Sequence, residues 1–304
     1  MDLHLPIAGV SVNALVIVAL GGLVGVLSGM FGIGGGFLTT PLLIFYGIPP
    51  AVAVASSATQ ITGASVSGVL AHTERKGVDF RMGGMLVAGG LVGTGLGAWA
   101  FSTLQRSGQI DTAIGLLYVA LLGSIGLLMA RESAAALGYL DAGPPKPPRA
   151  RLSWRWVHRL PLRWRFHRSG LYISPLAPLL LGAVSGVLTV LLGIGGGFIV
   201  VPALIYLLGV STRVVVGTSL IMILFVTAAT TLVHAVTTRS VDIVLAALLL
   251  LGSVVGAQWG ARFAQRVRPD RLRLALAILV LIVALRMALG LGWRPDEIYT
   301  IEPL

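Results

Sequence analysis

The chain has 304 residues, of which 56% are hydrophobic and only 11% are charged, whereas a soluble globular domain carries about 25% charged residues. This composition excludes a water-soluble enzyme and a disordered protein, and it indicates a chain that lies mostly in lipid. The absence of cysteine excludes disulfides, thiolate nucleophiles and cysteine-held metal centres. The net charge of +11 would suggest a nucleic-acid partner only if the charge formed one exposed surface.

Ten apolar segments follow one another along the chain, and we expect each to be a helix. They cover residues 12–31, 36–47, 51–72, 82–103, 111–130, 175–192, 197–209, 213–236, 241–262 and 271–293. The fold class is therefore an all-α integral membrane protein. Segments 36–47 and 197–209 are too short to span a bilayer comfortably, and the sequence leaves open whether they cross fully or are re-entrant.

The two halves of the chain are copies of each other. The string Gly-Ile-Gly-Gly-Gly-Phe at 32–37 recurs at 193–198, and each copy is followed by a proline, Pro41 or Pro202. Later matches pair Ser57 with Ser219, His72 with His234, and Asp79 with Asp242. Each copy has five segments, and a copy that follows an odd number of crossings enters the membrane from the opposite side. We therefore expect two inverted five-segment repeats with helices broken at the glycine turns, as in many secondary transporters.

The chain divides into a first transmembrane repeat at 1–130, a basic, proline-rich loop at 131–174 and a second repeat at 175–304. If each segment crosses once, all Lys and Arg residues except Arg106, Arg239, Arg286 and Arg294 fall on one side. The positive-inside rule then places the central loop in the cytoplasm and both termini outside. This asymmetry accounts for the high net charge without a nucleic-acid partner.

Aromatic and basic residues alternate in the central loop, at 154–156 and 163–168. Such patches bind single-stranded nucleic acid in some proteins. Beside membrane helices they more often place aromatic rings at headgroup depth and arginines on anionic lipids. We expect anionic lipids as the partner of this loop. The oligomeric state is left open, and a homodimer is one option.

The glycine turns are candidate anion sites. Successive glycines break a helix at membrane depth, which frees backbone N–H groups and aims the positive end of the next helix into the protein. The alternative is that these glycines only allow close helix packing, which we expect for the evenly spaced glycines of segments 82–103 and 241–262. Matched hydroxyls follow each turn. The candidate substrate-binding residues are Gly34, Gly35, Gly36, Phe37, Ser56, Ser57, Gly195, Gly196, Gly197, Phe198, Thr218 and Ser219.

Other chemistry has little support in the sequence. No Asp or Glu lies in the interior of an apolar segment, because Asp111 and Asp242 stand at the very start of theirs, so a buried carboxylate relay is unsupported. His72 and His234 stand at matched helix ends, where either a proton-linked or a structural role fits. Nucleotide-binding, zinc-protease and hydrolase motifs are missing. We expect no catalytic residue, no metal and no cofactor.

The duplicated glycine turn, its proline and the glycine-spaced helix resemble the sulfite exporter TauE/SafE family of membrane permeases. The matching positions are Gly34, Gly35, Gly36 and Pro41, with Gly195, Gly196, Gly197 and Pro202. The resemblance implies transport of small sulfur-containing anions, such as sulfite or organosulfonates, across a prokaryotic inner membrane.

We therefore expect a secondary transporter of such anions, working as an exporter. Two alternatives stay open: an anion channel that uses the same turns, and a non-transporting membrane assembly or lipid-interacting protein whose basic loop recruits a partner. The sequence leaves open the compound, the direction of transport and the coupling ion.

Overall fold

The computed structural model describes residues 2–31, 36–74, 78–136, 164–166, 171–210, 212–264 and 269–292. Each predicted segment is a helix in these ranges: α1 (Ala14–Phe31), α2 (Gly36–Phe45), α3 (Pro50–Glu74), α4 (Phe80–Arg106), α5 (Ile110–Ala136), α7 (Leu176–Leu192), α8 (Gly197–Tyr206), α9 (Thr212–Val233), α10 (Ile243–Ala264) and α11 (Pro269–Gly292). A π-helical turn, η1 (His234–Thr238), continues α9 and ends at Arg239, whose φ is 50°.

Two short antiparallel hairpins depart from the all-helical expectation. β1 (Asp2–Leu5) pairs with β2 (Val10–Asn13), and β3 (Trp164–Phe166) pairs with β4 (Leu171–Ile173). The first hairpin stands immediately before α1 and the second shortly before α7, where the segments were too short to reveal a strand pattern. Gly9, with a φ of 66°, completes the turn of the first hairpin.

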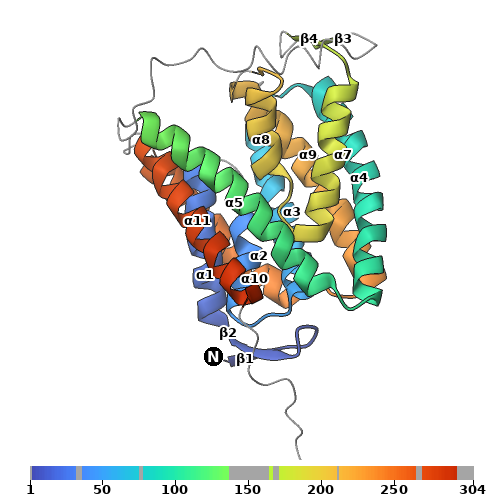
Figure 1. Cartoon of the computed structure of the whole chain (residues 1–304), viewed down its shortest axis with the longest axis vertical. Helices are drawn as coiled ribbons and strands as arrows, with labels where there is room; N and C mark the ends of the chain where they lie inside the picture. Colours follow the sequence, from blue (N-terminus) through green and yellow to red (C-terminus); the bar gives the residue numbers. More distant parts are fainter. Residues whose placement is uncertain are drawn as a thin grey trace, which may run out of the picture. The chain divides into compact units, whose positions relative to one another are not determined.

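The described helices form two compact units. The first contains 1–108 and 143–267, and the second contains 109–142 and 268–304. In the second unit α5 packs along α11. In the first unit α1 packs along α10, α4 along α7, and α3 against α9 (Figure 1). The helix pairs α1–α10 and α4–α7 thus join segments from different halves of the sequence.

Closely packed glycines make these two helix pairs possible. In α4, a Cβ at Gly89 or Gly93 would run into the backbone of α7, and one at Gly97 would stand 3.0–3.1 Å from Val190 and Val187. In α10, a Cβ at Gly252, Gly256 or Gly260 would run into the backbone of α1. Backbones approach this closely only where no side chain intervenes. The expectation that these glycines serve packing is confirmed. We call these two contacts the glycine seams.

The two short helices turn back on the helices that precede them. In the Leu5 cluster, Leu43 near the end of α2 lies with Val12 of β2 and Ile17 near the start of α1. The whole cluster is Leu5, Ala8, Val12, Ile17, Leu43, Ile48, Val52, Ala53, Leu245 and Leu249. The Met82 cluster gathers the end of α8 with β4 and comprises Met82, Leu86, Ile173, Val200, Leu204, Leu208, Val210, Val215, Met222 and Val226. Each short helix therefore packs back on the helix before it, and we call the pairs α1–α2 and α7–α8 hairpins.

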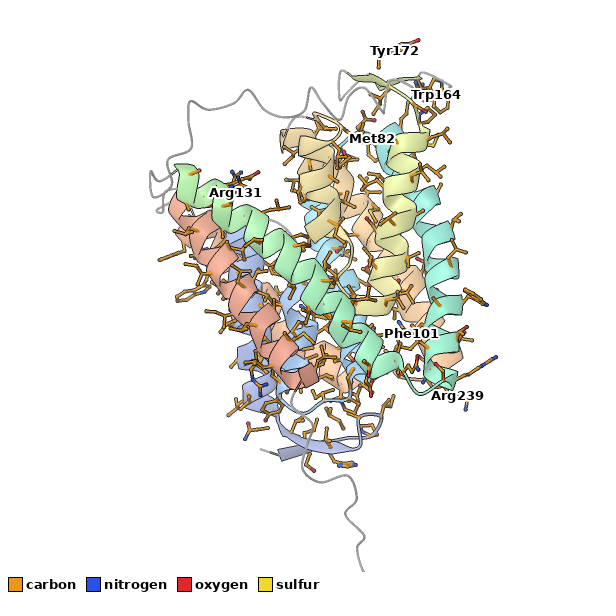
Figure 2. All side chains as sticks on the ribbon, in the orientation of Figure 1. Met82, Phe101, Arg131, Trp164, Tyr172 and Arg239 are labelled. Atoms are coloured by element: carbon orange, nitrogen blue, oxygen red, sulfur yellow. The ribbon has the colours of Figure 1, made fainter. Side chains whose placement is uncertain are left out.

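The two hairpins return toward opposite ends of the first unit. Met82 lies toward the end that carries β3 and β4 (Figure 2), whereas β1 and β2 lie at the other end (Figure 1). Large apolar side chains cover much of the outer surface, and Trp99 and Trp259 are each 70% exposed. In the described part of the chain five helices, α4, α5, α9 with η1, α10 and α11, contain spans long and apolar enough to cross a membrane. Exposed apolar surface of this extent is typical of contact with lipid.

Candidate functional site

The second glycine turn interrupts the chain between α7 and α8. The N–H of Gly193 donates to Thr189 O at 2.8 Å and ends α7. Gly193, Gly195 and Gly196 have φ values of 68°, 74° and 73°, a left-handed region that residues with a Cβ rarely adopt. The chain therefore needs glycine here to reverse direction. In the first turn only Gly36 lies within the described residues, as the first residue of α2; Gly34 and Gly35 lie outside them.

The second turn presents backbone N–H groups in a buried place. All residues from 193 to 198 are buried. Within the described chain, the N–H groups of residues 194–198 have no acceptor, while those of Ile199 and Val200 donate to Gly196 O at 3.1 and 2.9 Å. These donors stand at the positive end of α8. The turn thus has the chemistry of an anion site made from backbone alone.

A second helix start meets this turn. The rings of Phe37 and Phe198, each the second residue of its helix, stack with centroids 4.4 Å apart and planes 12° from parallel. A Cβ added to Gly36 would stand 2.9 Å from Ile194 O. The N-termini of α2 and α8 therefore converge, and their dipoles add at one place. The expectation that the two turns build one site rests on this convergence.

Four buried hydroxyls without a hydrogen-bond partner surround the second turn. Within the described residues they are Thr40 of α2, Ser57 of α3, Ser185 of α7 and Thr230 of α9. Such groups are rare in proteins, because an unpaired buried hydroxyl costs about 1–3 kcal/mol.

Thr40 and Ser185 flank the turn directly. Thr40 Oγ1 lies 3.1 Å from the position of a Cβ on Gly193, and Ser185 Cβ lies 3.2 Å from the corresponding position on Gly196. Sequence reasoning missed both residues, because each is an isolated hydroxyl in an apolar stretch. A signal was present for Thr40: it follows Gly36 by four residues and so shares its helix face.

Ser57 and Thr230 occupy helix faces that touch the turn. Ser57 lies between Val54 and Ile61 on one stripe of α3; Val54 O is 2.6 Å from a Cβ placed on Gly193, and the Ile61 methyl Cγ2 is 3.0 Å from one on Gly195. On α9, Thr230 follows Thr227 by one turn, and the Thr227 methyl is 3.3 Å from the same Gly195 position. Thr40 and Ser185 thus flank the turn, and Ser57 and Thr230 lie on the faces of α3 and α9 that approach it.

The other predicted hydroxyls have partners. Ser56 Oγ accepts the N–H of Asp242 at 3.2 Å, and Thr218 Oγ1 accepts the N–H of Asp79 at 3.0 Å. The two aspartates cap α10 and α4. Ser56 and Thr218 thus join the halves of the sequence, a role that the sequence pattern did not indicate. Ser219 donates to Val216 O of its own helix at 3.1 Å, so the matched residues Ser57 and Ser219 differ in structure.

His234 ties the end of α9 to the last turn of α7. Its Nε2 lies 3.1 Å from Val190 O, and its Nδ1 lies 3.3 Å from Thr238 Oγ1. The ring meets the edge of Phe101, whose place is marked in Figure 2. His234 is fully buried. Its bond reaches Val190, the α7 residue that stands three positions before the second turn. The side chain of His72 lies outside the described residues.

Threonine pairs join α3 to α9 beside the turn. Thr62 and Thr227 lie 2.9 Å apart through their hydroxyl oxygens, and Thr59 and Thr231 lie 3.3 Å apart. Within the described residues no group of three His, Asp or Glu side chains could hold a metal ion. The groups placed beside the turn are backbone N–H groups and hydroxyls, which are neutral donors.

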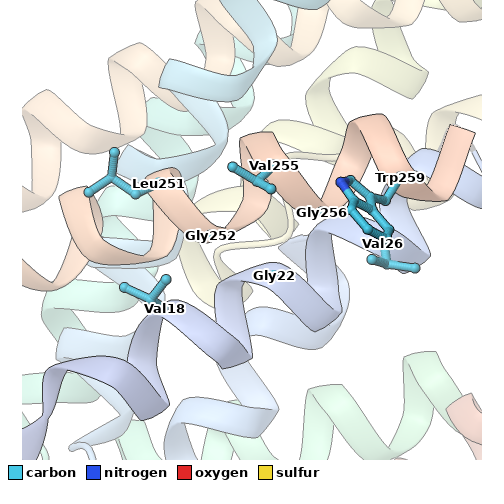
Figure 3. Close-up of a pocket in the computed structure, with 8 residues that line it drawn as sticks. All are labelled: Val18, Gly22, Val26, Leu251, Gly252, Val255, Gly256 and Trp259. Carbon is cyan, nitrogen blue, oxygen red and sulfur yellow. The ribbon is translucent and has the colours of Figure 1, made fainter.

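A pocket on the α1–α10 seam has a different character. It is lined by Val18, Gly22, Val26, Leu251, Gly252, Val255, Gly256 and Trp259 (Figure 3). Leu251, Val255 and Trp259 are largely exposed, so this is an open apolar groove on the outer surface. It has no donors for an anion other than the Trp259 indole, and it is not the candidate site.

Comparisons with known proteins give one family model and several membrane-transporter relatives. A family model described as "Sulfite exporter TauE/SafE" matches residues 17–287. The "Probable membrane transporter protein YjnA" of Bacillus subtilis is 29% identical over 260 residues, covering 84% of this chain and 92% of its own. A "Probable membrane transporter protein" of Xylella fastidiosa strain 9a5c is 33% identical over 258 residues, covering 84% of this chain and 86% of its own.

No solved structure matches the chain. The family match and the candidate spans make this a multi-pass, helical membrane protein, and the names of its relatives support a membrane transporter. The resemblance seen in the glycine turns is confirmed, and the chain belongs to the sulfite exporter TauE/SafE family.

Proposed function

We propose that the chain is a secondary transporter that exports small sulfur-containing anions, such as sulfite or organosulfonates. One observation carries the proposal: two helix N-termini converge on a buried turn whose free N–H groups are flanked by the unpaired hydroxyls of Thr40 and Ser185. Such a site binds an anion without a buried cation or carboxylate. We assign substrate contacts to the turn and to Thr40, Ser57, Ser185 and Thr230. The chain is a permease and not an enzyme.

The transporter consists of two inverted repeats of five segments. The reciprocal pairing of α1 with α10 and of α4 with α7 supports this. If each hairpin, α1–α2 and α7–α8, enters and leaves from one side, a repeat still crosses an odd number of times, because two crossings are removed together. Rocking of one part against another around the central site then alternates access.

The same parity keeps the orientation that the basic residues indicate. The central loop 131–174 lies in the cytoplasm and the termini outside a prokaryotic inner membrane. Anionic lipids bind the basic loop. An inside-negative membrane potential drives an anion outward with about 2.3 kcal/mol per charge per 100 mV. Export by uniport therefore needs no coupling ion, in keeping with the absence of acids from the interior of the predicted segments.

The experiment is flux of radiolabelled sulfite, sulfate, thiosulfate and a small sulfonate in proteoliposomes under an imposed potential. We expect one sulfur anion to show saturable, potential-driven flux with counterflow. The variant Gly195→Val should lose it, because valine is strained at a φ of 74° and meets Ile61. The control Ser253→Ala removes a hydroxyl that bonds to its own helix at Leu250 O, and it should transport like the wild type.

Two results would contradict the proposal. Absence of flux for every sulfur anion would remove the assigned cargo. Flux that does not saturate and shows no counterflow would indicate a channel instead of a transporter.

A further inference from the structure

Two phenylalanine rings meet where the two helical hairpins touch. Phe37 and Phe198 occupy matched positions directly after the two glycine turns, and each is only 1% exposed. Their near-parallel rings stack at 4.4 Å between centroids. Equivalent residues of the two halves therefore contact each other directly.

The hairpins that carry these rings come from opposite ends of the first unit. Hairpin α1–α2 returns to the end of the Leu5 cluster, and hairpin α7–α8 returns to the end of the Met82 cluster. The stacked rings are at the tips where these hairpins meet. A route between the two ends that follows the glycine turns must pass this pair.

Polar groups stand close to the pair along the chain. The N–H groups of the second turn stand immediately before Phe198, and Thr39, two residues after Phe37, donates to Gln60 Oε1 at 3.3 Å. The Thr62–Thr227 pair lies next to Ile61, which touches both Gly36 and Gly195. An apolar constriction in a polar route excludes water and ions until it opens.

We propose that the Phe37–Phe198 stack is the central gate of the transporter, a dry barrier that parts when an anion passes from one end to the other. This inference rests on the proposed function. Because the rings belong to different hairpins, relative movement of the hairpins separates them without unfolding either helix. The gate and the anion site are adjacent, so that arrival of an anion at the turn and separation of the rings are coupled events.

The test compares Phe37→Ala, Phe198→Ala and the double variant with the control Leu38→Ala. Leu38 is the neighbour of Phe37 on α2 and is equally buried, so its truncation removes apolar volume without touching the stack. Chloride leak is measured as the decay of an imposed potential across proteoliposomes. Sulfite counterflow is measured in parallel.

We expect the double variant to raise chloride leak about tenfold over the wild type, since a stacked aromatic pair is worth about a factor of ten. The control should not raise leak. Leak in monodisperse Phe variants that equals the control would overturn the gate. Sulfite counterflow in the wild type with no added leak in the variants would leave the proposed function standing and the gate wrong. Added leak without sulfite counterflow in the wild type would leave the gate standing and the cargo wrong.

A second measurement covers the case in which the alanine variants fold poorly. The chain has no cysteine, so Phe37→Cys with Phe198→Cys introduces a unique pair for a short, cleavable thiol cross-linker. Cross-linking should stop sulfite flux, and reduction should restore it. Undiminished flux in the cross-linked protein, or failure of the two cysteines to cross-link, would overturn the proposal.

Discussion

Glycine does two different things in this molecule. In the seams the glycines lie inside regular helices, and an added Cβ would collide with the backbone of the neighbouring helix: at Gly93 it would stand 2.9 Å from Ala183 Cα. In the second turn the glycines have positive φ, and at Gly196 an added Cβ would meet side chains of Met222, Ser185 and Thr189 at 3.1–3.3 Å. The seams need the absence of a side chain, whereas the turn needs backbone freedom.

The difference separates stability from transport. Replacing a seam glycine must push two helices apart, which weakens the packing of the whole unit and lowers its stability. Replacing a turn glycine strains one residue and disturbs the groups that would hold an anion. Substitutions in the seams should therefore lower stability, and substitutions in the turn should lower transport.

The largest effect should come from the seams. Gly93→Ala and Gly256→Ala place a methyl group against backbone, and overpacking typically costs about 1–3 kcal/mol. We expect a clear drop in the thermal unfolding midpoint, followed by tryptophan fluorescence, and a loss of monodisperse protein. Gly95→Ala is the matched control in α4, because nothing lies within 4 Å of its Cβ position. If Gly93→Ala were as stable as Gly95→Ala, the seam account would be wrong.

The turn should affect transport more than stability. Gly196→Ala holds alanine at a φ of 73°, a strain of about 1–2 kcal/mol, so the protein should remain folded while sulfite flux is lost. Gly47→Ala is the control: its φ is 92°, and nothing lies within 4 Å of its Cβ position. It carries comparable backbone strain away from the turn and should keep its flux. Equal losses of flux in both variants would mean that strain alone is responsible.

Adjacent serines should behave in opposite ways. Ser57→Ala removes an unpaired hydroxyl, so the unfolding midpoint should stay or rise, while the KM for the anion should increase about tenfold through loss of a hydrogen bond to charge. Ser56→Ala leaves the buried N–H of Asp242 unpaired and should cost about 1–3 kcal/mol of stability, with a smaller change in KM. Measuring the KM and the unfolding midpoint of both variants tests whether Ser57 binds the anion. A larger KM change in Ser56→Ala together with a larger loss of stability in Ser57→Ala would contradict that role.

The threonine pair between α3 and α9 should have the smallest effect. Hydrogen bonds between membrane helices average about 0.6 kcal/mol, so a double-mutant cycle of Thr62→Val and Thr227→Val should give a coupling energy near that value. Unfolding in denaturant by each variant supplies the four free energies. A coupling above about 2 kcal/mol would show that this polar stripe stabilises the unit more than the seams suggest.

Much of the fold could be predicted from the sequence, because apolar length and glycine spacing act locally. The helix segments, the packing role of Gly89 or Gly252 and the break at Gly193 all follow from a few neighbouring residues. The partner of each helix did not follow, because α1 packs on α10 across more than half of the chain. The two β-hairpins were also missed, since three or four residues carry too little pattern.

Only part of the candidate site could be predicted from the sequence, and its role in binding stays a prediction. The glycine turn and Ser57 were found because they repeat or cluster. Thr40 and Ser185 were not, since a single hydroxyl in an apolar helix is indistinguishable from one that bonds to its own backbone. Conversely, Ser56 and Thr218 repeat at matched positions because they bind the matched capping residues Asp242 and Asp79. Repetition alone therefore does not distinguish a binding residue from one that holds the two halves together.

The most direct test of the central claim is to locate the bound anion. Crystals of the purified protein soaked with selenite, a heavier analogue of sulfite, would reveal the selenium by its anomalous scattering. The account predicts a selenium peak whose oxygens lie at hydrogen-bond distance, about 2.7–3.2 Å, from the N–H groups of Gly195 and Gly196 and from the Ser185 hydroxyl. A peak held only by arginines of the basic loop, with none at the turn, would contradict it.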